Sequence, residues 1–167
     1  MDWAKEDMKN EIELMKEIHE IVPSLYLTSF EGANNEKKVK GLGITHAVTL
    51  LSRINEPYRQ YLKENNIKSL YILCEDAPDV KLYKAFKEAH TFIDKARKNG
   101  GKVMVHCMAG VSRSSTIVIS YMMWRAHLKK EQCDVKTHLE KVRSKRPIVE
   151  PNPGFISQLQ TFQGMLR

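Results

Sequence analysis

The chain has 167 residues, of which 42% are hydrophobic and 28% charged, and its formal net charge is +7. This length and balance predict one water-soluble domain with a single core, and they exclude a disordered chain, a collagen-like repeat and a membrane protein. The positive charge favours anionic partners of some kind.

Four basic residues near the C-terminus, Lys141, Arg143, Lys145 and Arg146, have no aromatic residues between them. This pattern is more typical of a solvated helix face than of a nucleic-acid interface. We therefore expect no nucleic-acid partner.

The three cysteines, Cys74, Cys107 and Cys133, are an odd number at irregular spacing, with no signal peptide before them. They do not predict a disulfide framework, which favours a reducing compartment. No apolar run approaches the roughly 18 residues of a membrane span. Asp2 excludes N-myristoylation, and the C-terminus offers no cysteine for prenylation. We expect a monomer without a membrane anchor in the cytoplasm, with the nucleus as a second compartment.

Residues 1–20 are expected to form an amphipathic helix packed on the domain, because Met8, Ile12 and Met15 share one helical face. Residues 21–167 are expected to form the domain itself. Four short apolar runs then predict strands, at Ser24–Thr28, His46–Leu51, Ser69–Leu73 and Lys102–His106.

Between the third and fourth strands, Leu82, Phe86, Ala89 and Ile93 recur at helical spacing, which predicts a crossover helix. Ser114–Ala126 is apolar almost all round and predicts a buried helix. Two more helices are predicted, one carrying Val135, Leu139 and Val142, the other carrying Phe155, Leu159, Phe162 and Leu166. Alternating strands and helices predict an α/β domain with a central, mostly parallel sheet of four to five strands and helices on both faces.

The loop between the fourth strand and the buried helix has the composition of an anion site. It reads His106-Cys107-Met108-Ala109-Gly110-Val111-Ser112-Arg113-Ser114. A loop from a strand into a helix can turn successive backbone N–H groups inward, and the helix dipole reinforces the site. Gly110 permits a tight turn, and the planar fork of Arg113 can hold two phosphate oxygens. We expect residues 108–113 to bind phosphate, or sulfate in its place.

Cys107 would lie at the floor of this cradle, where the groups that bind an anion also stabilise a thiolate nucleophile. The alternative is a small buried hydrophobic residue, which is the usual place of a free cysteine. His106 is expected to support the loop through hydrogen bonds rather than act as a base. Cys74 and Cys133 lack such a setting and are interpreted as structural thiols.

The pattern His-Cys, five residues, then Arg-Ser resembles the signature of the dual-specificity protein tyrosine phosphatases. The resemblance extends to Pro23-Ser24-Leu25-Tyr26-Leu27, to Gly43-Ile44-Thr45-His46 and to Pro151-Asn152-Pro153-Gly154-Phe155. It implies a small, atypical phosphatase domain over residues 21–167, with a phosphatase-like fold, phosphorylated proteins as substrates and neither a metal nor a cofactor.

The resemblance also implies roles for single residues. Cys107 would attack phosphorus, Arg113 would bind the phosphate, and an aspartic acid would protonate the leaving group. Asp76 is preferred for the acid, with Asp79 as the alternative because it precedes a helix and fits a cap. Ser114 would ease the departure of sulfur or simply cap its helix, and Asn152 would support the loop or simply form a turn.

Two other functions stay open at this point. The same chemistry could act on a non-protein phosphate such as a phosphoinositide, an RNA 5′ end or a phosphorylated glucan. The domain could instead be an inactive phosphate-binding adaptor or a sulfur-transfer domain, although the complete set of cysteine, arginine and candidate acid argues against an inactive site.

Overall fold

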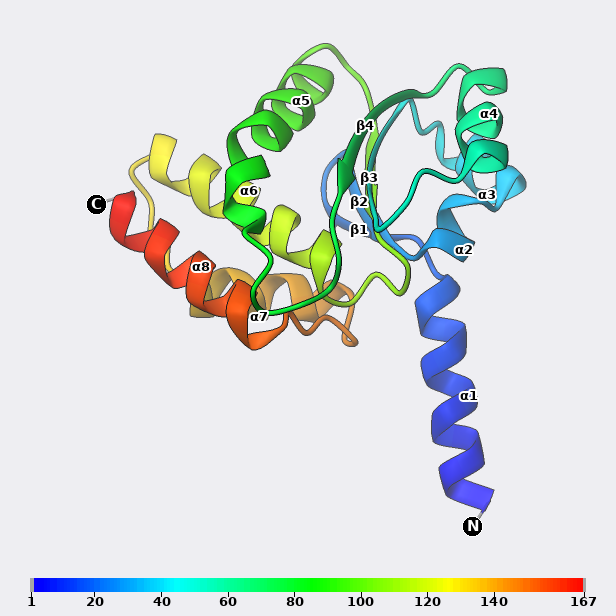
Figure 1. Cartoon of the computed structure of the whole chain (residues 1–167), viewed down its shortest axis with the longest axis horizontal. Coiled ribbons are helices and arrows are strands. Elements are labelled where there is room, and N and C mark those ends of the chain that lie inside the picture. Colours follow the sequence, from blue (N-terminus) through cyan, green and yellow to red (C-terminus); the bar gives the residue numbers. More distant parts are fainter. Residues whose placement is uncertain (1, 167) are drawn as a thin grey trace.

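The fold is organised around a five-stranded sheet in the order β1-β2-β5-β3-β4 (Figure 1). The computed structural model describes residues 2–166. The strands are β1 (His19–Val22), β2 (Leu25–Thr28), β3 (His46–Leu51), β4 (Lys68–Leu73) and β5 (Val103–His106). β1 runs antiparallel to β2, and the other pairs are parallel. The predicted α/β fold with a mostly parallel sheet is confirmed, and β1 is a strand that the sequence analysis did not predict.

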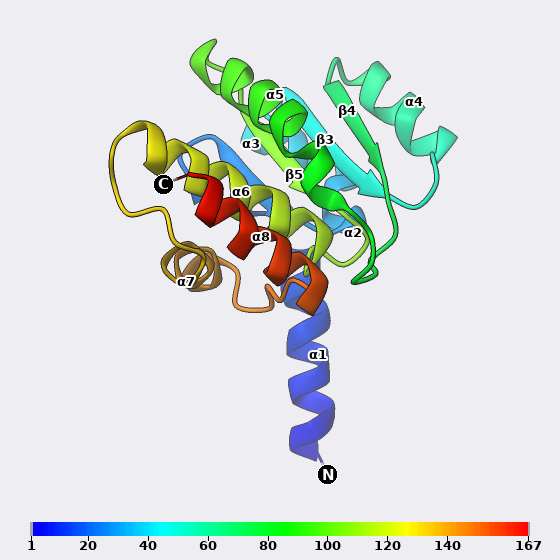
Figure 2. The same ribbon diagram turned by 60° about the vertical axis from the view of Figure 1, so that its left-hand side comes forward.

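Helices cover both faces of this sheet, as Figure 2 shows. They are α1 (Asp2–Lys16), α2 (Phe30–Ala33), α3 (Glu36–Leu42), α4 (Glu56–Glu64), the 3-10 turn η1 (Leu82–Ala85), α5 (Phe86–Lys98), α6 (Arg113–Leu128), α7 (Val135–Lys145) and α8 (Pro153–Met165). The predicted crossover helix is η1 followed by α5. The predicted core helix is α6, and 12 of its 16 residues are buried.

Side chains on each central strand alternate between two hydrophobic clusters. In β5, Val103 and Val105 face the cluster that contains α5, α6, α7 and α8, whereas Met104 faces the cluster that contains Tyr58 and Leu62 of α4. A strand that is buried on both faces reads as a continuous apolar run, which is how β5 was recognised in the sequence. Burial on both sides fixes the end of β5, and therefore the loop that follows it.

The N-terminal helix departs from the expectation. α1 ends at Lys16 rather than at residue 20, none of its residues is buried, and it projects from the domain (Figures 1 and 2). The apolar residues Met8 and Ile12 are exposed. The prediction that this helix packs on the domain is wrong for all but its last turn, because the rest of the helix extends away from the domain and its side chains are exposed.

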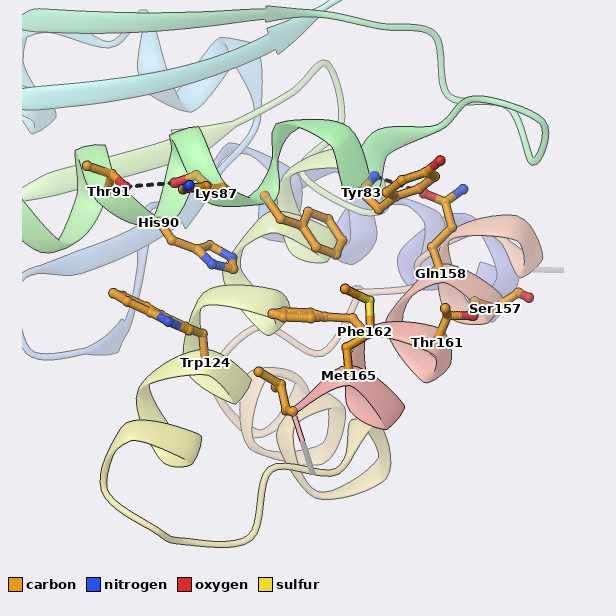
Figure 3. A pocket seen from close by; sticks show the side chains of 12 residues that line it. Tyr83, Lys87, His90, Thr91, Trp124, Ser157, Gln158, Thr161, Phe162 and Met165 are labelled. Carbon is orange, nitrogen blue, oxygen red and sulfur yellow. Dashed lines mark hydrogen bonds between the residues drawn. The ribbon is translucent and has the colours of Figure 1, made fainter.

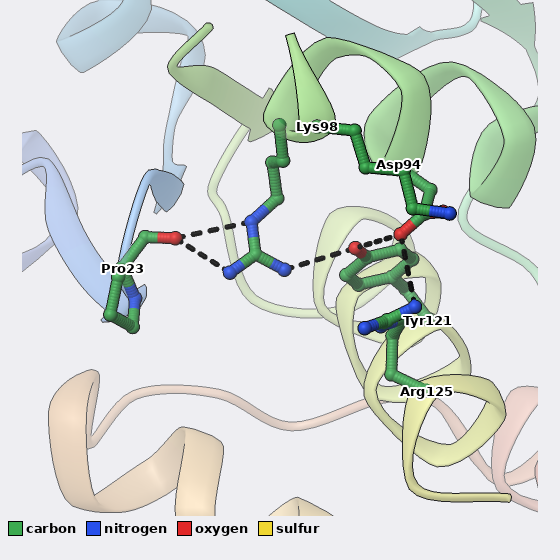
Figure 4. Close-up of polar contacts among 6 residues, drawn as sticks. Pro23, Asp94, Lys98, Tyr121 and Arg125 are labelled. Carbon is green, nitrogen blue, oxygen red and sulfur yellow. Dashed lines mark hydrogen bonds and ion pairs between the residues drawn. The ribbon is translucent and has the colours of Figure 1, made fainter. Parts of the chain in front are cut away.

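A polar network fastens the turn between β1 and β2 to α5 and α6 (Figure 4). Arg97 donates to the carbonyl of Pro23 at 2.7 Å and to the hydroxyl of Tyr121 at 2.9 Å. Tyr121 in turn donates to Asp94 at 3.0 Å, and Lys98 forms an ion pair with the same carboxylate. The side chains of Arg97, Tyr121 and Asp94 therefore all have partners within this network.

Among residues 2–166, no helix is long and apolar enough to cross a membrane.

Candidate active site

Cys107 begins the loop that joins β5 to α6. Its side chain is buried, and its Sγ lies 3.1 Å from the Oγ of Ser114 in the first turn of α6. The backbone N–H of Gly110 donates to Sγ at 3.3 Å. A thiolate at this position accepts both hydrogen bonds, and bonds to a charged acceptor are stronger than bonds to a neutral one. The sulfur of Cys107 therefore lies within reach of two hydrogen-bond donors.

The carbonyl oxygens of residues 108–111 all accept hydrogen bonds from outside the loop. The donors are the N–H of Phe30 to Met108 (3.0 Å), Arg146 to Ala109 (3.1 Å) and to Gly110 (2.9 Å), and the N–H of Glu150 to Val111 (2.8 Å). The carbonyl and the N–H of one planar trans peptide point in opposite directions. Holding these carbonyls outward turns the N–H groups of residues 109–112 toward the inside of the loop, as an anion site requires.

The guanidinium of Arg113 lies against the loop that follows β4 rather than in solvent, and the residue is only 8% exposed. Its Nη1 donates to the carbonyl of Cys74 at 2.9 Å and approaches Ser52 Oγ at 3.5 Å. Its Nε is buried and has no hydrogen-bond partner within residues 2–166. A buried charged donor without a protein partner is suited to an anionic ligand, because such a group is costly to leave unpaired.

His106 is completely buried behind the loop. Its Nδ1 lies 3.2 Å from the carbonyl of Cys107, and since a carbonyl only accepts, Nδ1 carries the proton. Nε2, which has one lone pair, is then the acceptor for one of the two hydroxyls beside it, that of Tyr58 at 2.7 Å or that of Thr49 at 2.9 Å. Burial lowers the pKa of His106 to about 4, so the ring is neutral at pH 7. This arrangement holds the loop, and the ring has no free nitrogen with which to act as a base.

The structure brings Asp76 and Asn152 together, although they are far apart in sequence. Nδ2 of Asn152 donates to Oδ1 of Asp76 at 2.9 Å, and the N–H of Asn152 donates to Oγ of Ser112 in the loop at 2.9 Å. Oδ1 of Asn152 also caps α8. Asn152 therefore links the loop to the segment that carries Asp76. The structure gives Asp79 no side-chain hydrogen bond or ion pair within the described residues, and both carboxylates are exposed.

The prediction of a solvated basic face is wrong for Arg146, which is fully buried and supports the loop. The sequence signal that could have revealed it is its place directly before Pro147, where the helical pattern of α7 ends. The sequence analysis also missed Tyr58 and Thr49, whose contacts with His106 come from other elements.

A separate apolar pocket of about 780 Å³ lies between α5, α6 and α8 (Figure 3). Phe86, Trp124 and Phe162 surround the ring of His90 in it, with ring centroids 5.5–5.8 Å from that of His90. The pocket shares no lining residue with the loop around Cys107. It is therefore not the anion site. Within residues 2–166, no three metal-ligating side chains come together.

Comparison with known proteins identifies the family of this chain. The family model described as dual specificity phosphatase, catalytic domain, matches residues 25–165. Dual specificity protein phosphatase 1B of Arabidopsis thaliana is 38% identical over 148 residues, which are 89% of this chain and 83% of that protein. The chain is 37% identical to MAP kinase phosphatase with leucine-rich repeats protein 3 of Dictyostelium discoideum, but it spans only 16% of that protein's length.

Solved structures of similar sequence share the fold of this chain. The crystal structure of human DUSP28 superposes with a TM-score of 0.78 at 28% identity, covering 89% of this chain and 94% of that one. DUSP15 gives a TM-score of 0.75 at 33% identity, covering 89% and 94%. Because the family match covers residues 25–165, which include strands β2 to β5, the Cys107 loop and helices on both faces of the sheet, the chain belongs to the dual specificity protein phosphatases.

Proposed function

We propose that the chain hydrolyses phosphotyrosine and phosphoserine or phosphothreonine in proteins through a cysteinyl-phosphate intermediate. The observation that carries this proposal is the loop around Cys107, in which the carbonyls of residues 108–111 are held outward. The inner N–H groups and Arg113 are then fixed where the charge of a phosphoryl group develops. Family membership supports the reaction class, and the contacts of this loop support the roles proposed for its residues.

In the first step, Sγ of Cys107 attacks phosphorus opposite the ester oxygen. The S–P bond forms as the P–O ester bond breaks, and the bonding pair goes to the ester oxygen, which takes a proton from Asp76 in its acid form. The bond from Asn152 orients the carboxyl of Asp76. Arg113 and the loop N–H groups bind the equatorial oxygens of the phosphoryl group.

In the second step, water attacks phosphorus and gives a proton to the Asp76 carboxylate. The S–P bond breaks and its electron pair returns to the sulfur of Cys107. The hydroxyl of Ser114, 3.1 Å from that sulfur, donates to it as negative charge develops. The cycle releases inorganic phosphate and restores both the thiolate and the acid form of Asp76.

Hydrolysis of p-nitrophenyl phosphate and of phosphotyrosine and phosphothreonine peptides tests this proposal. We expect the wild type to be active and Cys107→Ser to be inactive, because a serine hydroxyl is not ionised at neutral pH. An active serine variant would exclude the cysteinyl-phosphate route. An inactive wild type that binds phosphopeptides would make the domain an adaptor, and a phosphoinositide hydrolysed orders of magnitude faster than peptides would overturn the protein substrate.

The choice of general acid is tested with Asp76→Ala and its matched control Asp79→Ala. We expect Asp76→Ala to lower kcat by about 10²- to 10³-fold with little change in KM, since a proton donor acts mainly in the transition state. Asp79→Ala should stay within about twofold of wild type, because the structure gives its carboxylate no partner near the loop. The reverse result would move the role of the acid to Asp79. A Cys107→Ser variant that also carries Asp76→Ala should retain bound substrates for identification.

A further inference from the structure

Arg146, just after the end of α7, joins two parts of the chain that are far apart in sequence. On one side it donates to the carbonyls of Ala109 and Gly110 in the Cys107 loop. On the other side it binds the segment 14–19, which runs from the last turn of α1 into the first residue of β1. Those acceptors are the carbonyls of Leu14 (3.2 Å), Met15 (3.2 Å) and Glu17 (3.0 Å) and the Nδ1 of His19 (2.8 Å).

The end of α1 supplies these acceptors for a physical reason. The last carbonyls of a helix have no partner within the helix, and cationic side chains bind them well. Nη1 and Nη2 of Arg146 donate to these carbonyls, and Nε donates to Gly110 in the loop, so all three guanidinium nitrogens are engaged and the planar fork has one orientation. The side chain is fully buried, and within residues 2–166 it forms no ion pair with a carboxylate. Its charge is therefore compensated by these neutral acceptors.

The loop depends on the same guanidinium. The peptide between Ala109 and Gly110 has its carbonyl held by Arg146 at 3.1 Å, and the N–H of that same peptide donates to Sγ of Cys107. A rotation of this peptide would remove the hydrogen bond to sulfur. The orientation of Arg146 is thus transmitted through a single peptide unit to the nucleophile.

We propose that segment 14–19 and Arg146 form a positioning unit for the phosphate-binding loop, so that the N-terminal segment takes part in setting the turnover of the enzyme. This segment lies before residue 25, where the family match begins, so it is a feature of this chain beyond the matched domain. The proposal rests on the proposed function, because turnover is the quantity that it is expected to change. Arg146 is a positioning residue here, since it contacts the loop and not the substrate.

Two matched pairs of variants test the proposal. In the first pair, Arg146→Met removes the fork, whereas Lys145→Met removes the same charge from an exposed neighbour. In the second pair, His19→Leu removes the acceptor on the N-terminal side, whereas His19→Gln keeps an acceptor atom. We measure kcat and KM for p-nitrophenyl phosphate, the inhibition constant of orthovanadate, and thermal unfolding by circular dichroism for each variant.

We expect Arg146→Met to lower kcat at least tenfold and to raise the inhibition constant of orthovanadate by a similar factor, at a temperature where the variant is folded. His19→Leu should show the same two changes at a few-fold size, and His19→Gln and Lys145→Met should stay close to wild type. A role in stability alone would move the unfolding temperature and leave both kinetic constants unchanged in the folded enzyme.

The inference is overturned if His19→Leu and a folded Arg146→Met both retain the wild-type kcat and orthovanadate constant. If Arg146→Met does not fold, the His19 pair decides the question alone. Failure of the proposed function is a separate result, because it would appear as an inactive wild type. Orthovanadate binding, measured by calorimetry on that inactive protein and on the same variants, would still test whether Arg146 positions the loop.

Discussion

Acid should destabilise this protein through two buried imidazoles, His106 behind the loop and His90 in the apolar pocket. Burial lowers the pKa of each ring from 6.5 to about 4. Between these two pH values the unfolded chain binds a proton on each histidine and the folded chain does not. The free energy of unfolding therefore falls as pH falls from about 6.5 toward 4.

The size of the effect follows from the shift. A shift of one pKa unit corresponds to about 1.4 kcal/mol, so lowering the pH from 7 to about 4.5 should cost about 2 to 3 kcal/mol for each ring and about 5 kcal/mol for both. Single-domain proteins have a total stability of about 5–15 kcal/mol. The loss is therefore a large fraction of the stability and is measurable by urea unfolding at the two pH values.

The variant His90→Phe isolates one of the two rings. Phenylalanine suits a site lined by Phe86, Trp124 and Phe162, and its side chain has no basic atom that could bind a proton. The loss of stability between pH 7 and about 4.5 should be smaller than in wild type by about 2 to 3 kcal/mol. The exposed His127, changed to Gln, should leave the loss unchanged. An equal loss in wild type and His90→Phe would refute the argument that burial excludes the proton.

Two further predictions concern the loop. Gly110 has a φ of +69°, and an added Cβ would lie 2.5 Å from both the Thr28 carbonyl oxygen and Arg146 Nη2. Gly110→Ala should therefore lower kcat/KM for p-nitrophenyl phosphate by about 100-fold. A kcat/KM within twofold of the wild-type value would contradict this prediction. Burial raises the pKa of Cys74 to about 11. Iodoacetate at neutral pH should therefore alkylate Cys107 before Cys74, as measured by peptide mass mapping. The opposite order of alkylation would argue against a thiolate at Cys107.

The sequence alone predicted those features that depend on residues close together in the chain. The strand, loop and helix around Cys107 are continuous in the chain, and their chemistry depends on residue types at fixed spacing. The buried helix α6 and the crossover helix α5 were also predictable, because a helix that is apolar all round and a helix with one apolar stripe have different patterns. The family resemblance preferred Asp76 to Asp79 as the acid, and the structure adds a hydrogen bond from Asn152 to Asp76.

The remaining features depend on contacts between distant parts of the chain. Arg146 resembles its solvated neighbours in sequence, and only the fold places the end of α1 and the Cys107 loop around it. The strand β1 has four residues and a single buried side chain, Ile21, so it carries almost no alternating pattern. The apolar face of α1 predicts packing, but a periodic pattern specifies which face is apolar and does not specify what covers it.

The network of Arg97, Tyr121 and Asp94 lies beside the turn that precedes β2, whereas Cys107 follows the opposite end of the neighbouring strand β5. Substitutions at sites that share no partners usually have additive effects. Natural or engineered substitutions at one end of the sheet can therefore change the thermal stability without changing the reactivity of Cys107 at the other end. In this small domain, resistance to unfolding and catalytic turnover can therefore evolve independently.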